Sequence, residues 1–186
     1  LYIIVNAPNK IEVLDARTAK RIKKIDLINC RYIAFHNGKA YVSSYNAKIG
    51  LGSNSPNGEV VEIDTSSLSI SRTVSVGRQP DGIAVANDKL YVANSGGYNP
   101  NAYERTISVI DLNSLSEIKR IDVDINLHRL KADDKGNIFV SSRGDGYNKP
   151  PNFFMIDCQK DEVLRKFNVP VSNFWIEGDD IYTCAA

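Results

Sequence analysis

A recurring pattern of short strands constrains this chain more than any other feature. In residues 81–123, alternating apolar positions rich in Val, Ile and Tyr predict four strands, which are Ile83–Val85, Leu90–Ala93, Ile107–Asp111 and Ile118–Val123. Gly, Asn, Asp or Ser follows each strand, as expected where the chain turns. The segment therefore predicts one antiparallel meander of four strands.

Two markers show that this meander recurs. An aromatic residue in the second strand of each unit recurs at Tyr2, Tyr41, Tyr91, Phe139 and Tyr182. An aspartate that closes the third strand recurs at Asp15, Asp64, Asp111 and Asp157. The spacing of roughly 40 to 50 residues is that of a four-stranded propeller blade. Because radially packed meanders cover one another's faces, the sequence predicts an all-β fold, a β-propeller of four-stranded antiparallel blades.

The repeat predicts a single domain over residues 1–186, made of three complete blades and two partial ones. The expected blades are 1–27 (partial), 31–76, 81–123, 128–169 and 173–186 (partial). The innermost strands, Ile33–Phe35, Ile83–Val85 and Leu130–Ala132, are expected to lie beside a common axis. This number of blades closes no ring in the usual way, so we expect a fragment of a larger propeller, with uncovered sheet edges.

Composition limits the classes of function. The chain is 42% hydrophobic and 24% charged, a balance typical of globular domains, and its net charge of +1 argues against nucleic-acid binding. We find neither a run long enough to span a membrane nor a signal peptide. Cys30, Cys158 and Cys184 lack metal-site spacing, which leaves free buried thiols or one disulfide plus a free thiol. With two histidines, neither a metal site nor a cofactor is expected.

The longest connections predict where a ligand would bind. The loops between the second and third strands span residues 45–58, 95–105 and 143–152, and the meander topology places them on one face, opposite the tight hairpins. Long loops in a compact domain are usually functional or mobile. Their Tyr, Asn and Gly content suits a recognition surface. The alternative is that Gly, Asn and Pro only shape solvated turns.

A second candidate region is the start of each innermost strand, nearest the axis. Arg31, Asp81, His128 with Arg129, and Ser172 with Asn173 occupy equivalent positions there, while Trp175 is expected to pack between blades. The polar groups either line a solvated channel or donate hydrogen bonds to a ligand in a central pocket. The candidate ligand-binding residues of the two regions are Tyr45, Arg78, Tyr98, Asn99, Tyr103, Arg105, His128, Arg129, Arg143 and Tyr147.

Catalytic signatures are weak. Neither a G-x-S-x-G nucleophile elbow nor a phosphate-binding G-x-x-x-x-G-K-S/T loop is present. Two carboxylate pairs, Asp133-Asp134 and Asp179-Asp180, fall in tight hairpins on the face opposite the long loops. We therefore expect no catalytic residues and no enzyme activity.

Two short motifs resemble a known family. Residues 90–94 (LYVAN) and 109–111 (VID) resemble the YVTN-type repeat of surface-layer-like propellers, and AYVSS with VEID, IFVSS with FMID, and LYIIV with VLD are weaker copies. ANSGGYNPNAYERTISVIDL, SSRGDGYNKPP and NVPVSNFWIEGD are similar to surface propeller lipoproteins of Gram-negative gut bacteria. That resemblance implies a seven-bladed ring, and one branch of the family captures cobalamin for an outer-membrane transporter.

Together these features predict a non-enzymatic binding propeller. From the resemblance, its location would be the cell surface or periplasm and its ligand a corrinoid such as cobalamin. A glycan is the next candidate ligand, and an outer-membrane transporter is a candidate protein partner. The alternatives are an enzyme resembling the seven-bladed lactonases and a scaffold that docks another protein. Fold likeness alone does not decide among them.

Overall fold

The chain folds entirely as β-structure. The computed structural model describes residues 1–7, 9–52 and 54–184, which contain seventeen strands and no helix. Residues 185–186 of the last expected blade lie outside this range. The described part of the chain has no helical segment able to cross a membrane.

The strands form five antiparallel sheets, each a meander in chain order. The first sheet contains β1 (Tyr2–Val5), β2 (Lys10–Leu14) and β3 (Arg21–Asp26). The second contains β4 (Cys30–His36), β5 (Lys39–Ser44), β6 (Glu59–Asp64) and β7 (Ser69–Ser75). The third contains β8 (Pro80–Ala86), β9 (Lys89–Asn94), β10 (Thr106–Asp111) and β11 (Ser116–Asp122). The fourth contains β12 (Leu127–Ala132), β13 (Asn137–Ser142), β14 (Asn152–Asp157) and β15 (Glu162–Lys166), and the fifth contains β16 (Asn173–Glu177) and β17 (Asp180–Cys184).

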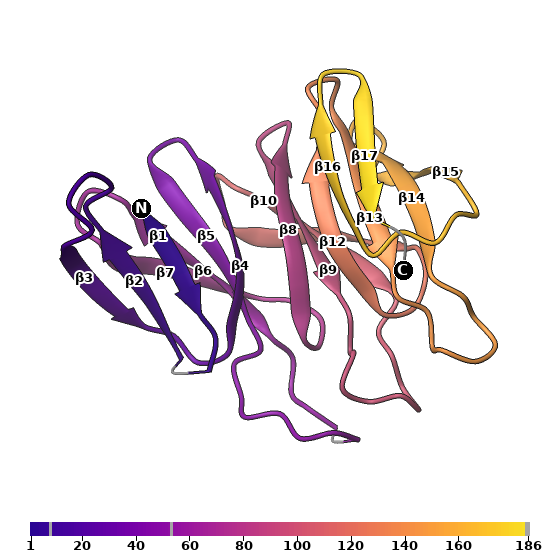
Figure 1. Ribbon diagram of the computed structural model, residues 1–186, viewed down its shortest axis with the longest axis horizontal. Helices are drawn as coiled ribbons and strands as arrows, with labels where there is room; N and C mark the ends of the chain where they lie inside the picture. Colours follow the sequence, from indigo (N-terminus) through magenta and orange to yellow (C-terminus); the bar gives the residue numbers. More distant parts are fainter. Residues whose placement is uncertain (8, 53, 185–186) are drawn as a thin grey trace.

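The sheets lie side by side in chain order (Figure 1). The first strands of neighbouring sheets contact one another, with β8 between β4 and β12 and with β16 against β12. The described residues of the loops at 45–58, 95–105 and 143–151 extend to the lower side of Figure 1, whereas the β4–β5, β8–β9, β12–β13 and β16–β17 hairpins lie at the upper side. The architecture is propeller-like, and the described residues do not close a ring.

Apolar side chains hold successive sheets together. Strands such as β5 are buried on both faces, because Ala40 and Val42 pack toward the first sheet whereas Tyr41 packs toward the third. Tyr91 and Phe139, at the same place in β9 and β13, likewise pack against the next sheet. Full burial of each such side chain contributes about 1.5 to 3 kcal/mol. The recurring aromatic therefore marks the packing between sheets.

The turns follow the chemistry expected of them. The first hairpin of each complete sheet, and that of the fifth, contains a residue with positive φ, such as Asn37, Gly38, Asn87, Gly136 and Gly178. Residues with positive φ match the twist of two-residue hairpins, and Asn and Gly adopt such φ values readily. The predicted closing aspartates accept backbone N–H bonds in the second hairpin, as in Asp64 Oδ1 with Ser66 N at 3.0 Å. Their role is structural.

Two predictions about single residues have clear outcomes. The expectation that Trp175 packs between sheets is wrong, because its side chain is 59% exposed while Phe174 is buried against the fourth sheet. Neighbouring residues of a strand point to opposite faces, so burial of Phe174 leaves Trp175 on the other face, where its ring contacts Lys131 Nζ of β12, 4.3 Å from the ring centroid. Cys30 and Cys158 are buried and Cys184 is exposed, and all three thiols are free.

Candidate functional site

A buried carboxylate lies at the centre of the site. Asp81, near the start of β8, has no exposed surface. Its carboxylate accepts hydrogen bonds from Arg31 Nε at 3.1 Å, from the Tyr45 hydroxyl at 2.9 Å and from Arg143 Nη1 at 3.4 Å. Arg31 comes from β4, while Tyr45 and Arg143 begin the loops after β5 and β13. Asp81 thus joins three neighbouring sheets at the loop end of their inner strands.

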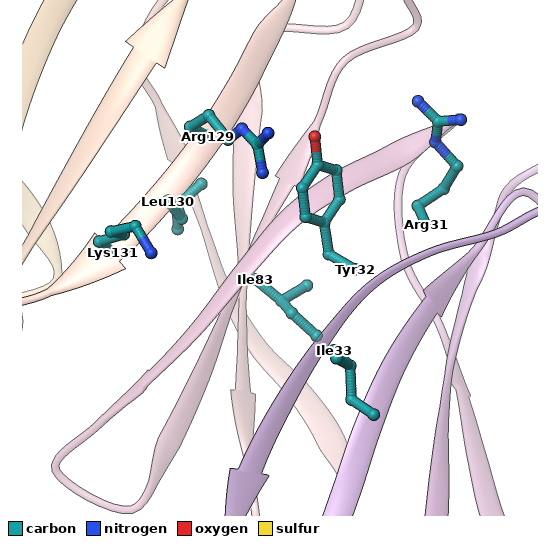
Figure 2. A pocket seen from close by; sticks show the side chains of 7 residues that line it. All are labelled: Arg31, Tyr32, Ile33, Ile83, Arg129, Leu130 and Lys131. Atoms are coloured by element: carbon teal, nitrogen blue, oxygen red, sulfur yellow. The ribbon is translucent and has the colours of Figure 1, made fainter. Parts of the chain in front are cut away.

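A second group of side chains lies beside this carboxylate. The Tyr32 hydroxyl is 2.8 Å from His128 Nε2, and the Arg129 guanidinium lies over the Tyr32 ring, 4.9 Å from its centroid. In Figure 2 the Tyr32 ring is drawn between Arg31 and Arg129. Arg129 Nε is buried and has no hydrogen-bond partner among the described residues. Stacking on Tyr32 therefore positions the Arg129 guanidinium while its Nε donor has no acceptor among the described residues.

These side chains border a cavity of about 560 Å³ between β4, β8 and β12. Its lining residues are Arg31, Tyr32, Ile33, Ile83, Arg129, Leu130 and Lys131 (Figure 2). The three aliphatic residues lie at the same strand position in three sheets, and the charged residues lie above and beside them. The cavity therefore combines an apolar wall with cationic and phenolic groups.

Burial and positive charge keep His128 neutral. Desolvation, together with the nearby guanidiniums of Arg143, Arg129 and Arg31, lowers the pKa of His128 from 6.5 to about 3. The Tyr32 hydroxyl and the backbone of Ser172 form hydrogen bonds with it, the second of which partly offsets the lowering, and burial also raises the pKa of Tyr32. At neutral pH the site therefore carries an uncharged imidazole beside several cations.

The unusual pKa of His128 predicts a pH dependence of stability. The unfolded chain gains a proton on this residue as the pH falls through 6.5, whereas the folded protein does so only near pH 3. The contribution of His128 to the free energy of unfolding is therefore full above pH 6.5 and is lost progressively toward pH 3. In urea denaturation across this range, His128→Gln is expected to lose stability less steeply than the wild type. An unchanged slope would show that His128 titrates normally when folded.

Comparisons with known proteins identify the fold but no family. No protein-family model and no curated protein matches the chain. Hydrazine synthase from Kuenenia stuttgartiensis matches with a TM-score of 0.77 and 18% identity, over 93% of this chain and 47% of that chain. The computationally designed Ika8 protein matches with a TM-score of 0.66 and 11% identity, over 100% of this chain and 52% of that chain. The chain spans about half the length of each, and likeness at these identities shows the fold alone.

The structure brings five of the predicted site residues together. Tyr45 and Arg143 meet at Asp81, and His128 and Arg129 meet at Tyr32. Tyr98 packs edge-on against Tyr45, with ring centroids 6.1 Å apart. The loops that contain Tyr45 and Tyr98 thus contact each other.

The other predicted residues lie in different surroundings. Asn99 is buried and donates to Asn54 Oδ1 at 2.8 Å, which ties the same two loops together. Arg78 pairs with Glu104 at 3.0 Å, and Arg105 pairs with Asp122 at 2.5 Å. Tyr103 is partly exposed in the second loop, and Tyr147 is 95% exposed in the third.

Sequence reasoning did not single out two residues of the cavity, Tyr32 and Lys131. Lys131 lies inside the predicted inner strand Leu130–Ala132, and Tyr32 directly precedes the predicted strand Ile33–Phe35, while the structure places both residues in inner strands, β4 and β12. The signal that could have found them is their neighbourhood, since Tyr32 follows Arg31 and Lys131 follows Arg129 by two positions. Among the described residues, no cluster of three or more His, Cys, Asp or Glu side chains could hold a metal ion.

Proposed function

We propose that the five sheets are blades of a β-propeller that binds a small molecule without transforming it. The ligand binds at the loop end of the inner strands, in the cavity beside Asp81. The observation that carries this proposal is the convergence of Arg31, Tyr45 and Arg143 from three places in the chain on one buried carboxylate. The cavity volume of about 560 Å³ lies within the usual range of ligand sites, roughly 300 to 1,000 Å³.

The chemistry of the site favours binding over catalysis. The Asp81 carboxylate accepts bonds from three side chains, so it is engaged in holding the sheets together. His128 has a pKa of about 3, and a base that weak takes few protons at neutral pH. Neither group is therefore poised for general acid or base catalysis, which supports the binding function over a lactonase-like enzyme.

The family resemblance supplies the specific ligand candidate. A corrinoid such as cobalamin is the first choice and a glycan the second, at the cell surface or in the periplasm, with an outer-membrane transporter as the protein partner. The contacting loops at 45–58 and 95–105 supply flat aromatic surface, since the Tyr98 side chain is 40% exposed above Tyr45. Aromatic and Arg side chains often dominate binding energy when a ligand covers them.

The proposed function predicts which substitutions weaken binding. The intact protein is purified from its source, and native mass spectrometry identifies any small molecule that accompanies it. Cyanocobalamin is then titrated into the protein, and calorimetry measures its affinity. Arg143→Ala and Tyr98→Ala are each expected to weaken binding by at least about tenfold, equivalent to about 1.4 kcal/mol.

Matched controls lie away from the cavity. Lys135→Ala removes an exposed hairpin cation and Arg120→Ala an exposed cation on β11, and both are expected to leave affinity unchanged. Melting temperatures confirm that all variants fold. Absence of both a bound small molecule and cyanocobalamin binding would contradict the function. Loss of affinity in Lys135→Ala but not in Arg143→Ala would place the site on the other face.

A further inference from the structure

Positive charge exceeds negative charge around the cavity. Four cationic side chains lie at or beside it, which are Arg31, Arg129, Lys131 and Arg143. Among the described residues, the carboxylate of Asp81 alone forms ion pairs with these cations. Its partners are Arg31 and Arg143. One negative charge against four positive charges leaves an excess of three. The chain as a whole has a net charge of +1, so this excess is local.

Two of the cations have no carboxylate partner among the described residues. Arg129 contacts the face of Tyr32, and its buried Nε atom lacks a hydrogen-bond acceptor. Lys131 Nζ lies over the Trp175 ring, 4.3 Å from its centroid. The face of an aromatic ring compensates a cation only partly, and a buried donor without an acceptor is destabilising. Both side chains thus lack the anionic partner that their surroundings would favour.

The paired arginines also retain donors. A guanidinium has five N–H groups, and the bonds of Arg31 and Arg143 to Asp81 use one nitrogen of each. Arg31 reaches the cavity wall and is held there by Asp81 and by the Tyr45 ring, 4.9 Å below it. Such a guanidinium is already oriented, so little side-chain entropy is lost when it binds a ligand.

The titration behaviour of two neighbours agrees with a strongly positive site. Burial lowers the pKa of both His128 and Lys131, and nearby arginines lower it further, which are Arg143, Arg129 and Arg31 for His128 and Arg129 for Lys131. Cations held this close repel one another, and an anion between them would relieve that repulsion.

We propose that the cavity between β4, β8 and β12 binds an oxyanion, the carboxylate or phosphate group of a small molecule, through Arg31, Arg129 and Lys131. Arg143 contributes charge from its position on Asp81. The aliphatic floor of Ile33, Ile83 and Leu130 contacts the uncharged part of that molecule. The inference deepens the proposed binding function and rests on it, because it names the chemical group that the site selects.

Simple anions test this directly on the intact protein. Inorganic phosphate and succinate are titrated by calorimetry at low ionic strength, with succinamide as the uncharged counterpart of succinate. At least one anion is expected to bind, succinamide is not, and added salt weakens the binding. Phosphate binding alone indicates a phosphate ester as the natural ligand, and succinate binding alone indicates a carboxylic acid.

Substitutions locate the binding. Arg129→Gln and Lys131→Met are each expected to weaken anion binding by at least tenfold. Arg120→Gln and Lys119→Met remove the same charges from β11 and are expected to have little effect. If Arg129→Gln fails to fold, Lys131→Met still provides the test, because its ammonium makes no ion pair among the described residues.

Three outcomes would overturn the oxyanion site. These are failure of both anions to bind, equal binding of succinamide, and an equal loss of affinity in the β11 variants. Cyanocobalamin, titrated in parallel, separates this inference from the broader function. If cyanocobalamin binds in an Arg143-dependent manner while both anions fail, the oxyanion site is wrong and the binding function stands. If nothing binds, both are wrong.

Discussion

Asp81→Asn is expected to lower the free energy of unfolding by about 3 to 5 kcal/mol, because it removes the charge that compensates two arginines at a fully buried position. The Asn side chain occupies nearly the same volume, so the loss comes from electrostatics and hydrogen bonding. Tyr45 and Arg31 would each lose a charged acceptor. Urea denaturation at neutral pH measures the change.

A surface aspartate provides the matched control for Asp81. Asp88 lies in the hairpin after β8, and its side chain is 72% exposed while it pairs with His36 at 2.9 Å. Exposed pairs of this kind contribute about 1 kcal/mol or less, so Asp88→Asn is expected to change stability little. If Asp81→Asn costs no more than Asp88→Asn, Asp81 does not hold the three sheets together.

Gly82→Ala is expected to destabilise the protein by about 3 kcal/mol or more, because β8 and β12 approach too closely for any side chain. A Cβ atom at Gly82 would lie 2.3 Å from the His128 carbonyl oxygen and 2.6 Å from the Leu130 nitrogen. Both atoms belong to the backbone of β12, so no side-chain rotation relieves the contact. The two inner strands would have to separate, and the cavity between them would widen.

A second glycine serves as the control for this steric effect. A Cβ atom at Gly50 would have no neighbour within 4 Å, and the residue has no positive φ. Gly50→Ala is therefore expected to be neutral or slightly stabilising, since alanine restricts the unfolded chain. Thermal unfolding of the two variants gives the comparison. Similar melting temperatures for Gly82→Ala and the wild type would contradict the close packing of β8 on β12.

Much of the fold could be predicted because the residues that determine the strands and turns recur at short, regular intervals in the sequence. The continuous apolar run Ala40, Tyr41 and Val42 is typical of a strand buried on both faces, and the recurring aspartates mark the second hairpins. The start of β8 was harder to predict. Pro80 and Gly82 favour turns, so the predicted strand begins at Ile83, whereas the structure pairs Pro80 with Asn94 across an irregular register.

The site could be predicted only where it follows from the repeat. The repeat places Arg31 and Asp81 at equivalent starts of inner strands, and in the structure the two side chains form an ion pair. The repeat of the strands does not determine the conformation of the loops between them. The three long loops also differ in length and sequence. Arg105 therefore pairs with Asp122 of β11, while Arg143 reaches inward to Asp81. Arg105 is the last residue of its loop and Arg143 is the first residue of its loop, so the two arginines reach different partners.

The most direct measurement of where this protein binds its ligand is a crystal structure of the intact protein with the small molecule that accompanies it during purification. We predict density in the cavity between β4, β8 and β12, with an oxyanion of the ligand in hydrogen-bond contact with Arg129. Ordered ligand at the opposite end of the sheets, beside the hairpin lysines Lys39, Lys89 or Lys135, would contradict the site that these residues define.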